Sequence, residues 1–339
     1  SLNMKMGLQT NAKTRNAGFV LMVFFGGIMV GRQSSLVPYP QPPTKVDTSL
    51  QVTLDAKKNP SRSSGEPSLD SRMAKYSRRY RYLPAAPRFD YNPYPAPICG
   101  KEINFFDAFF KLDRKQRSRL NEDKFIYETF FKNRTTTMTG SAGTYVEIGA
   151  FNGIQESNTH FFDKCLGWEG LLVEGNPMNY QKVLENRIFA HKMSFAPTCD
   201  DVDPNATVQF SRYPMTNAGL KGHAKTYDLK PMVDVPCGPF TPVLSDIFNG
   251  RPINFFSLDV EGAEYLVLKT IDFQKIHIDV MMIEIKNNDC LEDDCEVRKL
   301  VRKKMEEEGY KRYESLVSAS DIYVHPNSIF QVKDVQPST

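Results

Sequence analysis

The sequence predicts an α/β fold, in which a mainly parallel sheet carries helices on both faces and ends in an antiparallel hairpin. Two observations predict this class. From residue 144 onward, short apolar runs typical of buried strands alternate with segments of helical periodicity, and such alternation is typical of parallel sheets. Near the end of the chain, two strand-like segments follow each other closely, which indicates a hairpin.

The individual elements follow from these patterns in chain order. Aromatic residues recur at helical spacing between 105 and 133, which predicts helices that pack against the core. Strands are expected at 144–149, 170–174, 189–196, 253–260 and 279–285, with 310–317 and 321–325 forming the hairpin. Helices are expected at 154–165, 178–187, 241–249, 264–272 and 295–308. The stretch 205–236 is irregular, with one candidate strand at 207–213.

The charge of the chain is distributed unevenly. The formal net charge of +3 divides into +3 for residues 1–31, +6 for residues 32–97 and −6 for residues 98–339. Nucleic-acid binding needs a clustered basic face that neutralises phosphates. We therefore expect no nucleic-acid partner for the acidic part, which is long enough to bury one sizeable core.

An uninterrupted apolar run spans residues 17–31 and is preceded by three basic residues and no acid. This charge pattern favours a cytosolic N-terminal tail, residues 1–16. No small-residue cleavage pattern follows the run, so residues 17–31 are predicted to be an uncleaved signal anchor that spans the membrane. The chain would then be a single-pass type II membrane protein of the secretory pathway, in the Golgi or endoplasmic reticulum, with a lumenal body. The alternative is secretion after signal cleavage.

Residues 32–97 contain eleven of the 22 prolines, mixed with serines and basic residues. Such a composition buries too little apolar surface to fold, so we expect a disordered basic stalk. The remainder is divided into a helical extension at 98–143, the main domain at 144–327 and a short tail at 328–339.

Six cysteines and two glycosylation sequons, which begin at Asn133 and Asn205, suit an oxidising lumen. Cys290 and Cys295 are near enough in sequence to close a short loop, although spacing does not establish a pairing. The chain has no C-x-x-C motif and its histidines do not cluster near the cysteines. No metal site is therefore expected.

Acidic residues recur where the predicted parallel strands end. The first strand ends near Glu147, the second gives Glu174, the fourth gives Asp259 and Glu261, and the fifth gives Glu284. Ligands of such sheets bind at the carboxyl ends of the strands, near the switch point of the topology. We therefore expect these carboxylates to surround the ligand site.

The loop from Glu147 to Gly153 is similar to a dinucleotide fingerprint but departs from it. Phe151 stands at the second glycine position, and Glu147 would repel a diphosphate. A nucleoside without phosphate that carries cationic groups, such as S-adenosylmethionine, fits better. Gly149 and Gly153 allow a tight turn, and Glu174 follows 21 residues later, where an acid accepts both ribose hydroxyls. The alternative is that both glycines only form the turn.

Three segments, residues 147–158, 166–177 and 256–264, together resemble the FkbM methyltransferase family, and the motif D-x-E-G-A-E in the third is the most specific part. The resemblance runs over roughly residues 140–326. It implies a class I, Rossmann-like methyltransferase fold with a seven-stranded sheet, S-adenosylmethionine as cofactor, and hydroxyl oxygens as methyl acceptors. Gly175 departs mildly, since related sequences often have a bulkier residue there.

The resemblance also implies roles for single residues. Glu174 would hold the ribose, Asp259 would face the methionine end of the cofactor, and Glu261 would lie at the mouth of the site. The complete set of predicted cofactor-binding residues is Glu147, Gly149, Ala150, Gly153, Glu174, Asn176 and Asp259.

Asp259 and Glu261 are the predicted catalytic residues. In a regular strand they would share a face, so that one holds the cofactor while the other accepts the proton of the acceptor. Alternatively, Glu261 caps the next helix and Asp259 only holds the cofactor. Glu284 is either a second base or the polar end of a buried strand.

The sequence thus predicts a membrane-anchored, S-adenosylmethionine-dependent O-methyltransferase that acts on a hydroxylated small molecule or a glycan in the lumen. Two alternatives stay open. One is a non-catalytic, membrane-anchored trafficking or binding protein with a methyltransferase-like domain. The other is a lumenal glycosyltransferase, because Asp201-Val-Asp203 forms a D-x-D motif that can bind a metal ion. No other sugar-nucleotide feature accompanies this motif, so a solvated turn is the preferred interpretation.

Overall fold

The computed structural model describes residues 67–88, 99, 107–132, 143–200, 203, 205–216, 219–221, 231–285, 293–332 and 337–338. All of them lie in the unit formed by residues 62–339. The expected N-terminal tail, the signal anchor and the first part of the stalk lie outside the described residues. Within the described part, no helix combines the length and the apolar character that crossing a bilayer requires.

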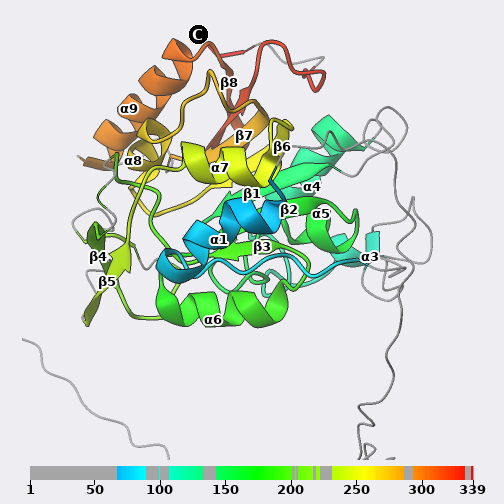
Figure 1. Cartoon of the computed structure of the whole chain (residues 1–339). Helices are drawn as coiled ribbons and strands as arrows, with labels where there is room; N and C mark the ends of the chain where they lie inside the picture. Colours follow the sequence, from blue (N-terminus) through cyan, green and yellow to red (C-terminus); the bar gives the residue numbers. More distant parts are fainter. Residues whose placement is uncertain are drawn as a thin grey trace, which may run out of the picture. The chain divides into compact units, whose positions relative to one another are not determined.

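The described residues form a seven-stranded sheet in the order β3-β2-β1-β6-β7-β9-β8 (Figure 1). Its strands are β1 (Thr144–Ile148), β2 (Glu169–Val173), β3 (His191–Met193), β6 (Ile253–Leu258), β7 (Ile278–Glu284), β8 (Lys311–Val317) and β9 (Ser320–Val324). The first five strands of this order pair in parallel, whereas β9 pairs antiparallel with both β7 and β8. The predicted mainly parallel sheet with a C-terminal hairpin is confirmed.

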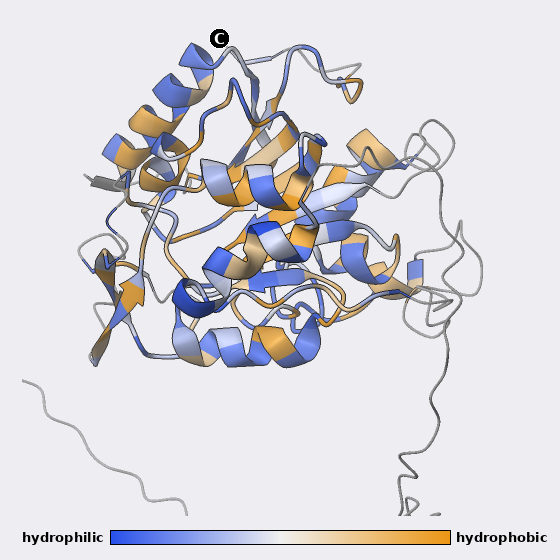
Figure 2. Cartoon of the chain, in the orientation of Figure 1, coloured by the Kyte–Doolittle hydropathy of each residue, from blue (hydrophilic) through white to orange (hydrophobic). Residues whose placement is uncertain are grey.

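Helices cover both faces of the sheet. One face carries α1 (Leu69–Arg79), α7 (Thr241–Phe248), α8 (Glu264–Lys269) and α9 (Asp293–Glu307). The other carries α3 (Asp107–Phe110), α4 (Glu122–Ile126), the π-helical turn η1 (Tyr127–Phe131), α5 (His160–Lys164) and α6 (Pro177–Asn186). Each face of the sheet has its own hydrophobic core, because successive side chains of a strand point to opposite faces. In β1, Val146 packs into the core beneath α1 and α7, and its neighbour Tyr145 packs into the core on the other face. Hydrophobic and hydrophilic positions accordingly alternate along helices such as α9 (Figure 2).

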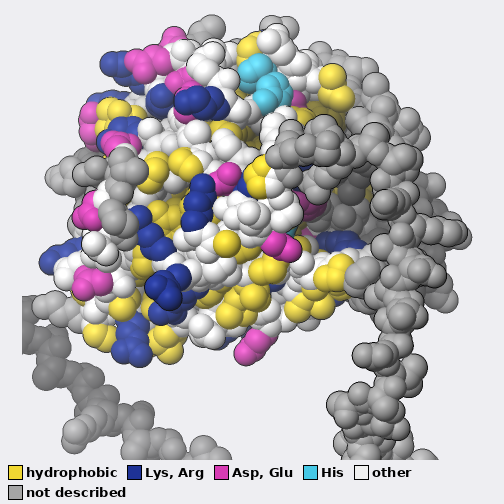
Figure 3. Space-filling model, viewed as in Figure 1, with side chains coloured by type: hydrophobic (Ala, Val, Ile, Leu, Met, Phe, Trp, Pro, Cys, Tyr) yellow, Lys and Arg dark blue, Asp and Glu magenta, His cyan; other side chains and the backbone are white. Residues whose placement is uncertain are grey.

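The surface seen in Figure 3 mixes Lys and Arg side chains with Asp, Glu and hydrophobic ones. Positive charge is therefore dispersed on this side rather than gathered into one basic face. The absence of a nucleic-acid partner stays a prediction.

Two further strands form a small separate sheet. β4 (Thr207–Ser211) pairs antiparallel with β5 (Met232–Pro236), whereas the sequence analysis expected a single candidate strand here. A disulfide between Cys199 and Cys237 and a parallel bridge between Ala196 and Cys237 fasten this sheet to the loop after β3. We call residues 205–216, 219–221 and 231–237 the β4–β5 arm.

The predicted helix at 154–165 begins only at His160. Before it, the hydroxyl groups of Ser157 and Thr159 and the backbone N–H of Asn158 all donate to the carboxylate of Glu147. The chain therefore turns around this carboxylate, and the helix starts only after the turn is complete.

The prediction of a disordered stalk at 32–97 is wrong for the part of it that the structure describes. Helix α1 lies in this range, and the hydroxyl group of Ser68 caps its N-terminus. Met73 and Tyr76 are buried against α7, and the hydroxyl of Tyr76 donates to Asp246 at 2.8 Å. Because α1 buries so few positions, its composition is hard to distinguish from that of an unfolded basic segment.

Replacing Met73 by Ala should lower the free energy of unfolding by about 2–5 kcal/mol, because the side chain is fully buried in the core beneath α7. Arg78→Ala on the exposed side of the same helix should change it by less than about 0.5 kcal/mol. Chemical denaturation of both variants measures the difference. Equal stability of the two would show that α1 is not part of the folded body.

Both segments that flank the predicted domain pack onto it. Residues 328–339 were expected to form a tail, but the Phe330 side chain is buried, with its ring centroid 4.8 Å from that of Phe131. The extension at 98–143 contains α3, α4 and η1, with turns between α3 and α4, and the disulfide Cys99–Cys165 ties it to the body. Cys295 is also disulfide-bonded, whereas Cys290 lies outside the described residues, so their pairing stays a prediction.

Candidate functional site

Two cavities lie at the carboxyl ends of the parallel strands. Cavity 1 has a volume of about 500 Å³ and cavity 2 of about 40 Å³. Four residues line both cavities: Gly149, Thr216, Asp259 and Glu261. Gly149 follows β1 and Asp259 follows β6, and these neighbouring strands mark the point where the strand order reverses, which is where such sheets bind ligands.

Gly149 makes the close approach of these two strand ends possible. Its φ is +87°, and a Cβ atom there would lie 1.8 Å from the backbone oxygen of Asp259. Ala150 follows it and lines cavity 1. Gly153 lines neither cavity; its φ is +81° and a Cβ atom would lie 2.7 Å from Cγ of Arg187. For Gly153, the structure thus shows a turn that packs against Arg187, and its contact with a cofactor stays a prediction.

Glu174 lines cavity 2, as expected for a residue at the end of β2. Its carboxylate accepts hydrogen bonds from the backbone N–H groups of Phe151 and Asn176, each at 2.7 Å. These two bonds fix the carboxylate between the loops that follow β1 and β2. Burial raises the pKa of Glu174 to about 8.

Glu147 lines neither cavity, and its predicted role in binding a cofactor stays a prediction. The side chain is only 3% exposed, and its two oxygens accept from Ser157, Asn158 and Thr159 at 2.6–2.8 Å. Arg187 adds an ion pair at 3.8 Å. The acid therefore shapes the loop between β1 and α5.

The hydrogen bonds of Asn176 are likewise made within the protein. It is fully buried, and its Oδ1 caps α6 by accepting from the N–H groups of Met178 and Asn179. Its Nδ2 donates to the backbone oxygens of Ser211 and Tyr213, both at 2.8 Å. Asn176 thus joins α6 to the β4–β5 arm, and its contact with a cofactor stays a prediction.

The motif D-x-E-G-A-E divides into structural and site residues. Glu264 accepts from the backbone N–H groups of Val260 and Gly262, both at 3.1 Å, and burial raises its pKa to about 7. Glu264 therefore holds the loop ahead of α8, and the side chain of the N-cap residue Ala263 makes no capping bond. Glu261 lines both cavities with φ of +57°.

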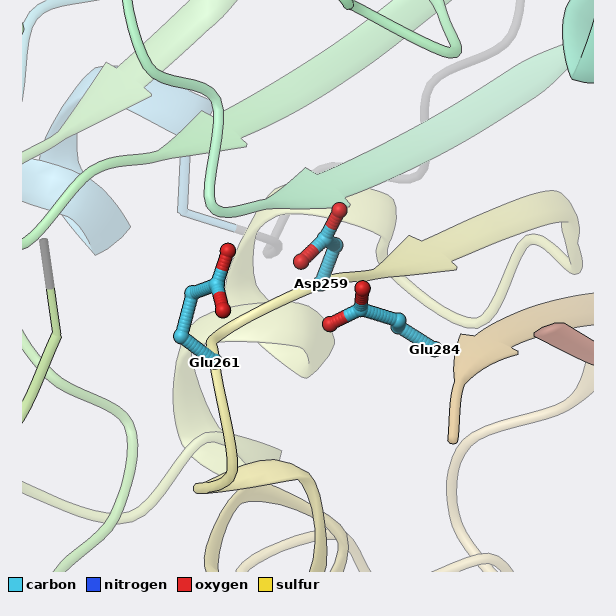
Figure 4. A group of neighbouring side chains, drawn as sticks. All are labelled: Asp259, Glu261 and Glu284. Atoms are coloured by element: carbon cyan, nitrogen blue, oxygen red, sulfur yellow. The ribbon is translucent and has the colours of Figure 1, made fainter. Parts of the chain in front are cut away.

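Asp259, Glu261 and Glu284 converge at the boundary of the cavities (Figure 4). Each offers a carboxylate oxygen, and these oxygens lie within 4.8 Å of one another. Burial raises the pKa of Glu284 well above its usual range, and the charge of Asp259 and a hydrogen bond with it act in the same direction. The carboxyl group of Glu284 therefore loses its proton less readily than a solvated one, and it is hydrogen-bonded to Asp259. No metal site was expected at the strand ends; these three oxygens are a set that could hold a divalent cation.

The outer walls of cavity 1 were not predicted. Arg119 and Glu122 reach it from the helical extension, and residues 318–320 reach it from the turn between β8 and β9. No local motif marks these positions, because their place depends on how distant segments fold over the strand ends. Asp203, the described half of the D-x-D motif, lines neither cavity.

One family model matches part of the chain. The family model described as the methyltransferase FkbM domain matches residues 147–312, which include all five acids at the strand ends. The comparison with curated proteins returned no match. One similar solved structure is a TehB-like SAM-dependent methyltransferase from Corynebacterium glutamicum, with 10% identity and a TM-score of 0.31; the similarity covers 60% of this chain and 85% of that chain.

Proposed function

We propose that the chain, whose residues 147–312 match the methyltransferase FkbM domain, transfers a methyl group from S-adenosylmethionine to a hydroxyl oxygen of an acceptor. One observation carries this proposal: a small and a large cavity meet at Gly149, Asp259 and Glu261. Direct transfer between two bound molecules requires two compartments with a common boundary, because the reacting atoms have to be held next to each other.

Single residues at cavity 2 and at its boundary with cavity 1 suit the polar groups of the cofactor. Glu174 presents a carboxylate that can accept from two hydroxyl groups, and the missing side chain of Gly149 leaves space for a close approach. Asp259 and Glu261 place negative charge at the boundary of the cavities, which suits a ligand with ammonium and sulfonium groups. Bound S-adenosylmethionine would supply a methyl group that its positively charged sulfur activates for displacement.

Cavity 1 would hold the acceptor. We assign different roles to the carboxylates that line it. Asp259 is already hydrogen-bonded to Glu284, so we assign it to holding the methionine end of the cofactor. Glu261 lines both cavities and is assigned as the general base that accepts the hydroxyl proton. The walls that exclude water come in part from the helical extension, through Arg119 and Glu122.

The proposal is tested by incubating the full chain with S-adenosylmethionine labelled in its methyl group and a panel of neutral mono- and oligosaccharides. We expect label in an alkali-stable ether on the sugar. Cofactor binding without any label transfer would instead favour the non-catalytic binding protein, since binding residues can persist without turnover. The glycosyltransferase alternative has no supporting observation at the described site.

The affinity for S-adenosylmethionine should rise with pH. Burial raises the pKa of Glu174 to about 8, so in the free protein its carboxyl group is protonated at neutral pH. The ionised form can accept from both ribose hydroxyls, so binding releases the proton, and the affinity increases by up to about tenfold per pH unit below pH 8 and then levels off.

Calorimetric titrations from about pH 6 to about pH 9 measure this effect. Glu174→Gln should weaken binding at high pH and remove this component of the pH dependence. Glu185→Gln, an exposed position on the neighbouring helix α6, should behave as the wild type. An unchanged pH profile in Glu174→Gln would contradict the assignment of Glu174 to the ribose.

We further propose that the acceptor is a glycan or another hydroxylated molecule of the secretory lumen. Support comes from the apolar run at 17–31, from the exposed sequon residue Asn205, and from the disulfides Cys99–Cys165 and Cys199–Cys237, which suit an oxidising compartment. In sealed microsomes the body should resist added protease until detergent is present. Digestion without detergent would place the body in the cytosol and remove lumenal acceptors.

A further inference from the structure

Cavity 1 is lined in part by two buried polar side chains, Asn158 and Ser257, which we call the Asn158–Ser257 pair. Asn158 is 9% exposed, and Ser257, in β6, is 1% exposed. The backbone N–H of Asn158 donates to the carboxylate of Glu147 at 2.8 Å, and its Nδ2 donates to Oγ of Ser257 at 3.1 Å. Glu147 and Ser257 lie opposite each other in the neighbouring strands β1 and β6. Asn158 is therefore fastened to both strands.

The Asn158–Ser257 pair has unused hydrogen-bonding capacity. No described residue donates to Oδ1 of Asn158, and the hydroxyl group of Ser257, which accepts from Asn158, donates to none of them. Buried polar groups of folded proteins are almost always hydrogen-bonded. The pair therefore offers a ligand one acceptor and one donor. A hydroxyl group matches both, because it donates one hydrogen bond and also accepts.

Ser157 also lines cavity 1 and is buried, but it has no such capacity. Its hydroxyl group donates to Glu147 at 2.8 Å. The same oxygen accepts from Arg187 at 3.2 Å and from the backbone N–H groups of Thr159 and His160. Burial beside the cavity thus does not by itself leave hydrogen bonds open, which makes the open positions of the Asn158–Ser257 pair specific.

The pair lies near the boundary of the two cavities. Asp259 follows two residues after Ser257, and two residues of a strand span about 7 Å. Met282, the neighbour of Ser257 in β7, lines cavity 1 as well. Cavity 1 therefore extends from Asp259 and Glu261 over β6 and β7 to the pair. One sugar ring can span this distance, so that different hydroxyl groups of the ring reach the two ends.

Resting on the proposed function, we propose that the Asn158–Ser257 pair binds a second hydroxyl group of the acceptor, on the same ring as the hydroxyl that receives the methyl group. The second hydroxyl donates to Oδ1 of Asn158 and accepts from the hydroxyl group of Ser257. The reacting hydroxyl then lies at the boundary, beside Glu261. The acceptors are ring polyols such as sugars, because an alcohol with a single hydroxyl group would leave the buried pair without these bonds.

The test measures label transfer from S-adenosylmethionine by the full chain to the methyl glycosides of glucose, galactose and mannose, and to each of their monodeoxy derivatives. Loss of the reacting hydroxyl abolishes transfer. For the best glycoside, loss of one further hydroxyl should lower kcat/KM by at least about a hundredfold, because a site built to bind a hydroxyl group rejects an analogue without it. Loss of any other hydroxyl should lower kcat/KM by less than about tenfold.

Asn158→Leu and Ser257→Ala should each reduce this discrimination to less than about tenfold, because the variant loses a hydrogen bond that the deoxy derivative never makes. Calorimetric titration with the best glycoside, in the presence of S-adenosylhomocysteine, should show a matching loss of affinity. The affinity for S-adenosylhomocysteine itself should not change. Thermal unfolding shows whether each variant is folded, and the smaller change Ser257→Ala carries the test if Asn158→Leu does not fold.

Gln181→Leu, which alters an exposed amide on α6 that lines neither cavity, is the matched control and should keep the discrimination of the wild type. The inference is overturned if the wild type loses less than about threefold on removal of every non-reacting hydroxyl. It is also overturned if both variants keep full discrimination, since the pair then binds water only. Either result leaves the proposed function intact, whereas absence of label from every glycoside overturns both.

Discussion

Exchange of Glu261 for Gln should lower the rate of methyl transfer by about 10²–10⁴-fold, the usual contribution of a general base. Glu261 lines both cavities at their boundary, and Gln has nearly the same shape but cannot accept the acceptor's proton. The affinity for S-adenosylmethionine should stay within a few-fold of the wild type, because the cofactor contacts are assigned to Glu174 and Asp259. Label transfer gives the rate, and calorimetry gives the affinity.

Glu156→Gln is the matched control, since Glu156 is an acid that lines cavity 1 but not cavity 2. It should keep most of the transfer rate. If Glu156→Gln and Glu261→Gln lose activity equally, the overall negative charge of the cavity matters and a specific base does not. If Glu261→Gln keeps the full rate, the proton is accepted elsewhere and the assignment of Glu261 is wrong.

Arg187→Met should lower the free energy of unfolding by about 3–5 kcal/mol, because it leaves buried acids without their counter-charge. The Arg187 side chain is 1% exposed. Its guanidinium donates to Asp163 at 2.6 Å, to Tyr145 at 2.8 Å and to the backbone oxygen of Gly153 at 2.8 Å. One side chain thus connects the end of α6 with α5, β1 and the loop beside the cavities.

Chemical denaturation measures this effect against Lys182→Met, which removes an exposed cation from the same helix and should change stability by less than about 0.5 kcal/mol. Because Arg187 fastens the loop that precedes α5, the affinity for S-adenosylmethionine should fall as well. A loss of stability no larger than that of Lys182→Met would show that the buried network contributes little.

The position of the residues at the strand ends could be predicted from the sequence, whereas their roles in binding and catalysis stay predictions. Gly149, Glu174, Asp259 and Glu261 were placed after the first, second and fourth strands, and all four line the cavities. This succeeded because parallel strands run in one direction, so residues at their carboxyl ends meet at one edge of the sheet whatever the loops do. Glu284 was named for the same reason, although its role was left open.

The division between structural and ligand-binding acids could not be predicted. Glu147, Glu174 and Glu264 are all buried, and all accept backbone N–H groups. Only Glu174 of these three lines a cavity. The number of oxygens in use does not separate them, because both oxygens of Glu174 accept backbone N–H groups whereas Glu264 uses only Oε1. Whether a carboxylate reaches a cavity is decided by the three-dimensional path of the loops rather than by the motif.

Segments with weak local patterns were also missed. Helix α1 has two buried positions in a basic, proline-rich region, and β5 lies far in sequence from its partner β4. Arg187 resembles an ordinary charged residue at a helix end, yet it is buried in an ion network. Each of these features is stabilised by contacts between distant segments, and no periodicity within the segment reveals them.

The central claim, that the two cavities belong to an S-adenosylmethionine-dependent methyltransferase, is tested most directly by calorimetric titration of the full chain with S-adenosylmethionine. We predict saturable binding at a single site, competition by S-adenosylhomocysteine, and weaker binding by Glu174→Gln. Absence of binding by a sample that unfolds cooperatively, together with binding of a sugar nucleotide in the presence of manganese, would contradict the claim and support a glycosyltransferase.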